Sequence, residues 1–204
     1  MNVITLNQPD MKRRVGIMGG TFDPPHYAHL FMGMEALHQF SLERVIFIPA
    51  NVPPHKREEM VPALHRLRMI SLAVKDEERF EVSDLEIKRG EISYTVETLR
   101  ELRSWYGENA ELYFLAGSDS AIELPTWRSP EEILKLCKFV VFERPGYPIS
   151  HIREDIKKEI IVANSLHLEI SSSEIRERIR EGKPIRYLLP PSVEEYIWKN
   201  GLYR

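Results

Sequence analysis

The sequence has little of several features that mark specialised classes of protein. It contains one cysteine, Cys137, so a disulfide within the chain is excluded and a reducing compartment is expected. No apolar run reaches the roughly 20 residues that a membrane-spanning helix needs, and no signal peptide or low-complexity tract is recognised. The formal net charge is only −3, which argues against a general nucleic-acid or membrane surface. These absences predict a cytoplasmic protein that binds neither nucleic acid nor membrane.

The chain does contain a regular alternation of apolar runs and helical patterns. Apolar runs predict strands at 14–18, 45–48, 80–82, 111–116, 139–142 and 166–170. Helical spacing and helix-start residues predict helices over 27–40, 62–73, 95–106 and 192–200, and two more that begin at Pro130 and Ser171. The expected fold class is α/β, a single doubly wound, Rossmann-like parallel sheet with helices on both faces and a small C-terminal helical part. Residues 1–12 lack periodicity and are expected to form a flexible extension to one domain over 13–204.

The polar motifs of the sequence follow the predicted strands. They lie at 19–20, 51–56, 117–119, 144 and 171–173. In an open parallel sheet the ligand binds at the carboxyl ends of the strands, where the strand order reverses. The placement of the motifs therefore predicts one composite site at that edge of the sheet.

The most informative stretch is residues 19–29, Gly-Gly-Thr-Phe-Asp-Pro-Pro-His-Tyr-Ala-His. Paired glycines let the backbone approach a ligand closely, and Pro24 and Pro25 hold the following loop extended. His26 and His29 lie where the next helix is expected to begin, so both imidazoles share one face beside free backbone N–H groups. Imidazoles, N–H groups and a positive helix dipole together predict an anion site, and the obvious anion is a phosphate chain.

Plainer interpretations compete with a phosphate site. His-x-x-His can be half of a zinc site, although no Cys cluster or Glu-flanked helix accompanies it, and Gly-Gly can be an ordinary turn. The whole stretch weighs against both, because it resembles the signature of the His-x-Gly-His nucleotidylyltransferases, and among them the bacterial nicotinate mononucleotide adenylyltransferases. Ala28 stands where that superfamily usually has glycine. Alanine is small and a good helix former, so both histidines should still be presented.

Four later segments are similar to motifs of the same family and occur in the expected order. They are the loop Asn-Val-Pro-Pro-His-Lys at 51–56, Ser-Tyr-Thr at 93–95, Gly-Ser-Asp at 117–119, and Ile-Ser-Ser-Ser-Glu-Ile-Arg at 170–176. In the last, Ser173 replaces the family's threonine and keeps the hydroxyl. Read without the family, these segments are an exposed loop lysine, helix caps at Thr95 and Asp119, and a capping box of Ser171 and Glu174.

The resemblance, which runs from Val15 to Tyr203, implies an activity. AMP would pass from ATP to nicotinate mononucleotide, giving nicotinate adenine dinucleotide and pyrophosphate, with Mg²⁺ bound mainly through the ATP phosphates. The catalytic residues implied are His26, His29, Lys56 and Arg176. The ATP contacts implied are Gly19, Gly20, Thr21, Phe22, His26, His29, Gly117, Asp119, Ile170, Ser171, Ser172, Ser173 and Arg176. The mononucleotide contacts implied are Asp23, Asn51, Lys56, Tyr94, Thr95, Trp127 and Arg144.

Two other functions stay open at this point. A sibling transferase acting on phosphopantetheine or glycerol phosphate would share the histidine pair and the serine-rich helix start, but not the Trp127 loop or the 93–95 segment. A nucleotide-binding regulator could keep the fold without turnover, although it would not need the leaving-group contacts Lys56 and Arg176. The sequence also leaves open the choice between nicotinate and nicotinamide mononucleotide, and whether the protein is a homo-oligomer.

Overall fold

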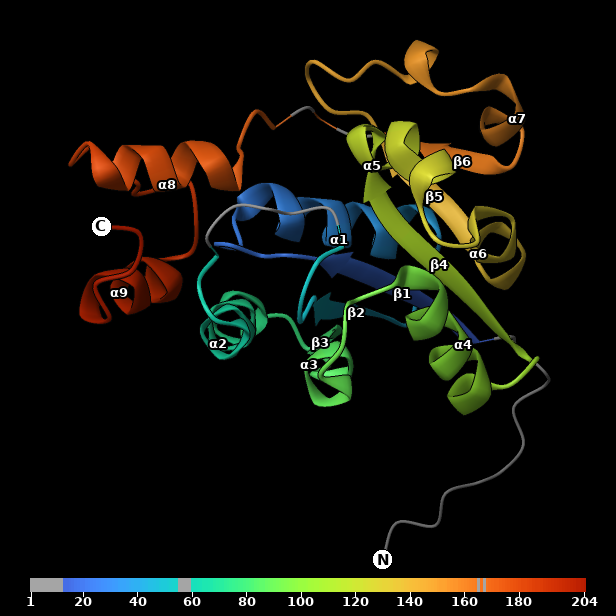
Figure 1. The fold of residues 1–204 in the computed structure, drawn as a ribbon, viewed down its shortest axis with the longest axis horizontal. Coiled ribbons are helices and arrows are strands. Elements are labelled where there is room, and N and C mark those ends of the chain that lie inside the picture. Colours follow the sequence, from blue (N-terminus) through green and yellow to red (C-terminus); the bar gives the residue numbers. More distant parts are fainter. Residues whose placement is uncertain (1–12, 55–59, 165, 167) are drawn as a thin grey trace, which may run out of the picture.

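The computed structural model describes residues 13–54, 60–164, 166 and 168–204, and within them six strands form one sheet. The strands are β1 (Arg13–Gly20), β2 (Arg44–Pro49), β3 (Phe80–Val82), β4 (Ala110–Gly117), β5 (Lys138–Phe142) and β6 (Ile160–Ala163). All neighbours are parallel, in the order β3-β2-β1-β4-β5-β6 (Figure 1). The order reverses between β1 and β4, the position at which a doubly wound sheet opens a ligand crevice. We call this position the switch point.

Helices cover both faces of the sheet. They are α1 (Tyr27–Gln39), α2 (Ala63–Val74), α3 (Leu85–Arg89), α4 (Thr95–Tyr106), α5 (Ser118–Glu123), α6 (Pro130–Leu136), α7 (Glu154–Lys157), α8 (Ser172–Arg180) and α9 (Pro191–Lys199), with 3₁₀ turns η1 (Leu124–Thr126) and η2 (Ile149–His151). Along β4, Leu112 and Phe114 pack into the core layer beneath α4 and α6. Tyr113 and Leu115 pack into the layer beneath α1, α2, α8 and α9. This alternation buries both faces of the strands, as a parallel sheet requires.

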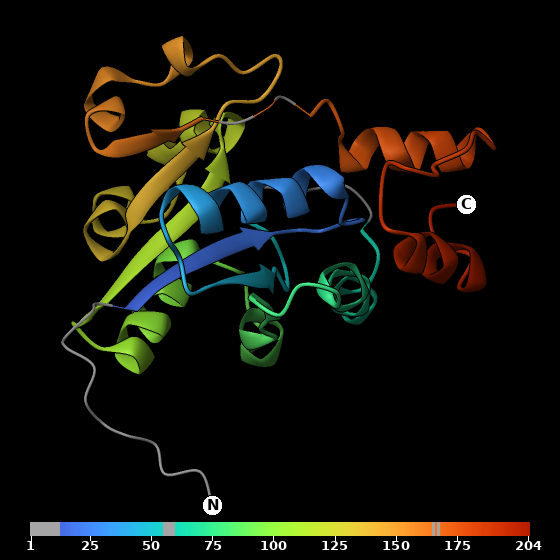
Figure 2. The ribbon, with the colours of Figure 1, turned by 180° about the vertical axis from the view of Figure 1, so that it is seen from behind.

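The C-terminal helices lie together at one end of the molecule. Figures 1 and 2 show α8 and α9 beyond the tip of β1, with the C-terminus between them. Val193 and Ile197 of α9 share a core layer with Met69 and Ile70 of α2. The C-terminal part thereby reaches the loops that follow β1 and β2. Among the described helices, none has the length and hydropathy of a membrane span.

Most predicted elements are confirmed to within one or two residues, but the predicted sixth strand is wrong. The strand is β6, Ile160–Ala163, which pairs with β5 from Phe139↔Ile160 to Phe142↔Ala163. The described residues 166 and 168–170 form no strand. Their alternation of apolar and polar residues is typical of a half-buried strand. However, Ile160–Ala163 already pairs along β5, and Leu166 and Leu168 are exposed.

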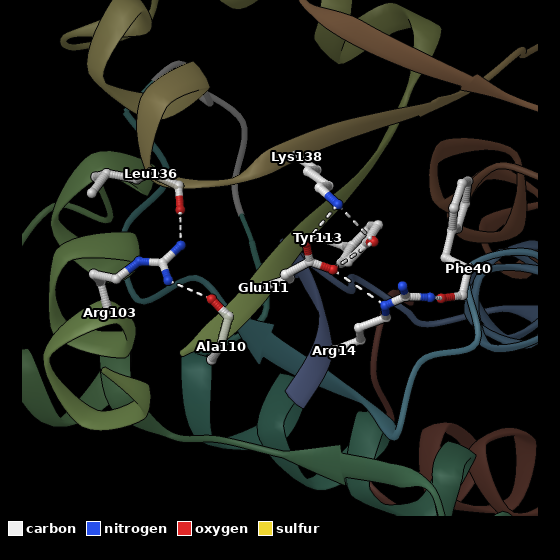
Figure 3. Close-up of polar contacts among 8 residues, drawn as sticks. All are labelled: Arg14, Phe40, Arg103, Ala110, Glu111, Tyr113, Leu136 and Lys138. Atoms are coloured by element: carbon white, nitrogen blue, oxygen red, sulfur yellow. Dashed lines mark hydrogen bonds and ion pairs between the residues drawn. The ribbon is translucent and has the colours of Figure 1, made fainter. Parts of the chain in front are cut away.

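Polar contacts hold together the opposite edge of the sheet, where the strands begin (Figure 3). Glu111 on β4 accepts hydrogen bonds from Arg14 Nε on β1, at 3.2 Å, and from Lys138 Nζ on β5, at 2.9 Å. Arg103 on α4 donates to the carbonyl oxygens of Ala110 and Leu136, each at 2.6 Å. The hydrogen bond from Lys138 lowers the pKa of Glu111. Charge pairs therefore occupy the end of the sheet where the strands begin. A site can form at the other end, where the strands finish.

Candidate functional site

The loop that leaves β1 at the switch point is packed against the core. We call residues 21–26 the histidine loop. Residues 22–26 are buried, and the peptide between Asp23 and Pro24 is cis. Phe22 has a φ of 51° and is 2% exposed, and its ring meets that of His29 edge-on with centroids 5.1 Å apart. The Phe22 ring thus joins the histidine loop to the start of α1.

The two histidines form a close pair. Their ring centroids lie 3.8 Å apart, and the backbone N–H of His26 donates to Nδ1 of His29 at 3.2 Å. His26 is 4% exposed, and within the described residues its Nδ1 has no hydrogen-bond partner. Burial, then the nearby His29 and Arg144, lowers the pKa of His26 well below 6.5. His26 is therefore a neutral imidazole at pH 7.

The end of β4 brings an acidic and a basic side chain together. Arg144 Nη1 donates to Asp119 Oδ2 in an ion pair, and the Arg144 backbone N–H donates to Ser118 Oγ at 2.9 Å. A Cβ on Gly117 would overlap the Asp119 carboxylate and come within 2.6 Å of Arg144 Cδ. A larger residue at position 117 would therefore require these two side chains to move. The structure thus pairs a residue predicted to contact ATP with one predicted to contact the mononucleotide.

A cavity of about 230 Å³ opens beside the end of β1. We call it the aromatic cavity; it is lined by Gly19, Gly20, Thr21, Ala50, Pro53, Pro54, Glu86, Ser93, Tyr94, Thr95, Phe114, Ser120, Glu123, Trp127, Arg128 and Ile133. Trp127 is half-buried and meets the rings of Phe114 and Phe139 edge-on, at 6.2 and 6.3 Å. The Arg128 guanidinium lies 4.7 Å from the centroid of the Tyr94 ring. A flat, half-exposed tryptophan in an apolar cavity suits a planar cationic ring.

The start of α8 lies against the histidine loop. Ser172 Oγ donates to the carbonyl oxygen of Pro24 at 2.8 Å, and Arg176 Nη1 donates to that of Asp23 at 2.9 Å. Ser171 Oγ caps the helix by accepting from the N–H of Glu174 at 3.1 Å. Ser171 thus caps α8, and the phosphate contact expected of the same helix start stays a prediction.

The structure places the other predicted site residues as follows. Asn51 contacts the cavity-lining Ser93, since its backbone N–H donates to Ser93 Oγ at 2.8 Å, and its side chain donates to the carbonyl oxygen of Glu91 at 3.2 Å. Ser173 Oγ lies 3.4 Å from Arg176 Nη2, and Ile170 packs against the core layer of α1. Lys56 lies outside the described residues. Their roles toward substrate stay predictions.

A family model described as cytidylyltransferase-like matches residues 17–178, from β1 into α8. The chain belongs to the cytidylyltransferase-like family.

Curated relatives of this cytidylyltransferase-like chain match it over nearly its whole length. A protein of Desulfitobacterium hafniense (strain Y51), named probable nicotinate-nucleotide adenylyltransferase, is 47% identical over 98% of this chain and 100% of the relative. A protein of Thermoanaerobacter sp. (strain X514) with the same name is 45% identical over 94% of each. The relationship to the nicotinate mononucleotide adenylyltransferases, which the motifs indicate, is confirmed.

Solved structures share the fold of this cytidylyltransferase-like chain. The Plasmodium falciparum nicotinic acid mononucleotide adenylyltransferase complexed with NaAD superposes with a TM-score of 0.78 at 22% identity, over 94% of this chain and 97% of that one. The same enzyme complexed with APC gives a TM-score of 0.76 at 22% identity over the same shares. The predicted Rossmann-like α/β class is confirmed.

Sequence reasoning missed one residue that organises the site of this cytidylyltransferase-like chain. Arg66 on α2 is 1% exposed and donates to the carbonyl oxygens of Thr21, Ala50, Asn51 and Val61, at 2.6 to 2.9 Å. One guanidinium thereby joins the loop after β1 to the loop after β2. An arginine in register with the buried positions of α2 is the signal that could have found it.

Proposed function

We propose that this chain transfers the adenylyl group of ATP to nicotinate mononucleotide and releases pyrophosphate. One observation carries the proposal: Gly19, Gly20 and Thr21 line the aromatic cavity and lead directly into the histidine loop. Two binding regions of different chemistry therefore share the end of β1. The aromatic cavity suits the pyridine mononucleotide, and the histidine pair near the start of α8 suits a triphosphate. The names of relatives that match the chain from end to end support the same substrates.

The aromatic cavity offers a reason to prefer nicotinate. Thr95 begins α4 at the cavity wall after the N-cap residue Tyr94, whose side chain makes no capping hydrogen bond within the described part of the chain. The positive end of a helix dipole and its first N–H groups attract an anion. A carboxylate gains more from that position than an amide does. The pyridinium ring would then lie against Trp127.

The transfer requires little covalent chemistry from the protein. A phosphate oxygen of the mononucleotide, already ionised at neutral pH, forms a bond to the α-phosphorus of ATP, and the bond from that phosphorus to the bridging oxygen breaks. Pyrophosphate leaves with the electron pair. No protein nucleophile or strong base is needed, so catalysis consists of positioning and of stabilising the charge that develops.

Four residues are assigned to that stabilisation. His26 and His29 would hold the triphosphate near its α-phosphate, with the neutral His26 imidazole acting as a hydrogen-bonding group rather than a charge. Arg176, with Lys56 from the segment outside the described residues, would bind the departing pyrophosphate. Asp119 would accept hydrogen bonds from the adenosine ribose, which requires it to share or release Arg144.

Mg²⁺ fits this site when it is bound to the phosphates of ATP. In the described part of the chain, no three His, Cys, Asp or Glu side chains gather into a metal-binding group. Asp119 is paired with Arg144, and Asp23 accepts a hydrogen bond from Tyr203. An ion held mainly by phosphate oxygens and water needs no such group. When bound, it would neutralise charge on the triphosphate.

The test is pyrophosphate release from ATP and Mg²⁺ with each mononucleotide in turn. Release is expected with nicotinate mononucleotide and at a lower kcat/KM with nicotinamide mononucleotide. Phosphopantetheine and glycerol phosphate serve as controls for the sibling transferases and should give none. ATP binding without release from either mononucleotide would contradict the proposal and favour a nucleotide-binding regulator.

A further inference from the structure

A tyrosine from the C-terminal segment reaches the histidine loop from behind. Tyr203, which follows α9, donates its hydroxyl to Asp23 Oδ1 at 2.7 Å. Asp23 lies three residues before His26 and is 1% exposed. The Tyr203 hydroxyl is therefore the neutral group that hydrogen-bonds a buried carboxylate at the base of the candidate active site. A buried carboxylate without such partners would be costly.

The two sides of this hydrogen bond have restrained backbones. Tyr203 has a φ of 67°, and Phe22, next to Asp23, has a φ of 51°. Bulky residues adopt the left-handed region where surrounding contacts hold them there, and such residues cluster at functional sites. Tyr203 also packs against the core layer of α1 and α2 and lies 3.9 Å from Met69 Sδ. The Tyr203 ring is thus held by contacts other than its hydrogen bond to Asp23.

The Tyr203 hydroxyl stays protonated and can therefore always donate to Asp23. Burial, then the charge of Asp23, raises the pKa of the Tyr203 phenol, so the hydroxyl keeps its proton throughout the physiological range. Asp23 lies among positive charges as well, since Arg66 and Arg176 both act on this pair. The Asp23 carboxylate consequently interacts with groups of the protein interior.

We propose that Tyr203 is a positioning residue for the adenylyl transfer, because its hydroxyl fixes Asp23 and thereby the loop that presents His26 to the triphosphate. The inference rests on the proposed function for its catalytic readout. It gives Asp23 a place in the loop's support, distinct from contact with the mononucleotide. Ser172 and Arg176 of α8 hold the carbonyl oxygens of the same loop, and Tyr203 holds its one buried carboxylate.

The test compares Tyr203→Phe with a matched control, Tyr196→Phe. Tyr196 Oη lies 2.9 Å from His65 Nδ1 and joins α9 to α2, so its loss removes a similar contact of the same C-terminal part without touching the histidine loop. Loss of one hydrogen bond to a carboxylate predicts roughly tenfold lower kcat in Tyr203→Phe. The KM for the mononucleotide should stay unchanged, and Tyr196→Phe should keep the wild-type kcat.

A second readout does not depend on turnover. The imidazole NMR signals of His26 and His29, assigned with His26→Asn and His29→Asn, should shift in Tyr203→Phe and stay in place in Tyr196→Phe. Unchanged signals in Tyr203→Phe, or equal changes in both tyrosine variants, would overturn the inference. Absence of pyrophosphate release by the wild type would instead refute the proposed function, and the imidazole signals alone would then decide the role of Tyr203.

Discussion

At the scale of single residues, the site depends on an imidazole that the fold keeps uncharged. His26 is buried beside His29 and Arg144, and all three influences lower its pKa. A neutral imidazole can donate one hydrogen bond and accept another. It can therefore hold a phosphate oxygen without the cost of desolvating a positive charge. Because His26 stays neutral in the folded chain, the free energy of unfolding should depend on pH.

The free energy of unfolding should fall as pH falls below 6.5. In that range the unfolded chain binds a proton at His26, with a reference pKa of 6.5, and the folded chain does not. Stability therefore rises with pH through this window. Urea denaturation at pH 7.5 and 5.5 should show a loss of about 1 kcal/mol from this group. His26→Asn should remove that component, whereas His151→Asn, at an exposed position, should retain it; an equal pH dependence in His26→Asn would contradict the assignment.

The neighbouring histidine should affect turnover more than binding. His29→Ala removes the imidazole that faces His26, and we expect kcat to fall about 100-fold or more, because a group that acts on the α-phosphate stabilises the transition state. The dissociation constant for nicotinate mononucleotide, measured by calorimetry, should change much less. Wild-type turnover in this variant would remove His29 from the catalytic role.

At the scale of elements, local patterns could predict most strands and helices but not the contacts that join them. The alternation of strands and helices and the motifs at the strand ends together predict a site at the carboxyl ends of the strands, because periodicity and turn chemistry are short-range properties. The strand order, which places the switch point between β1 and β4, is a property of the whole sheet. The pairings of Asp119 with Arg144 and of Asp23 with Tyr203 could not be predicted. They join residues 25 and 180 positions apart, and no local pattern encodes such a separation. The short helix α3, Leu85–Arg89, was also missed, since five residues are too few to show a helical period.

The helix α2 gives the clearest test of an element acting on the site. Arg66→Met leaves four backbone carbonyl oxygens without their donor, and unpaired buried acceptors are expensive. We expect the free energy of unfolding to fall by about 3 kcal/mol. Arg68→Met, at an exposed position of the same helix, should change it by less than about 0.5 kcal/mol. Equal urea midpoints for the two variants would show that the carbonyl contacts of Arg66 contribute nothing.

At the scale of the whole molecule, the two edges of the sheet have separate tasks. Charge pairs around Glu111 join β1, β4 and β5 where these strands begin. The candidate substrate regions lie where the same strands end. A parallel sheet places all its strand ends of one kind at one edge. A substitution at the end of the sheet where the strands begin should therefore change the free energy of unfolding and leave kcat unchanged.

Glu111→Gln tests this division. Since ionised Glu111 has a lowered pKa in the folded chain, its stabilisation is present above the unfolded pKa of about 4.5 and is lost as pH falls through the folded value. The variant should be less stable than the wild type by about 1 kcal/mol at pH 7, and the difference should narrow toward pH 4. The kcat should not change. Glu159→Gln, at an exposed position, is the control for both measurements, and a loss of kcat in Glu111→Gln would contradict the separation.

The hydrogen bond between Tyr203 and Asp23 has a consequence for biosynthesis. The two residues are separated by 180 positions, so the histidine loop leaves the ribosome long before the phenol that holds it. A nascent chain can pair β1 with β2 and then with β4 while the Asp23 carboxylate still lacks this donor. The last hydrogen bond of the loop forms only when residue 203 has emerged from the exit tunnel. Translation order thus makes this support of His26 form after the contacts among β1, β2 and β4.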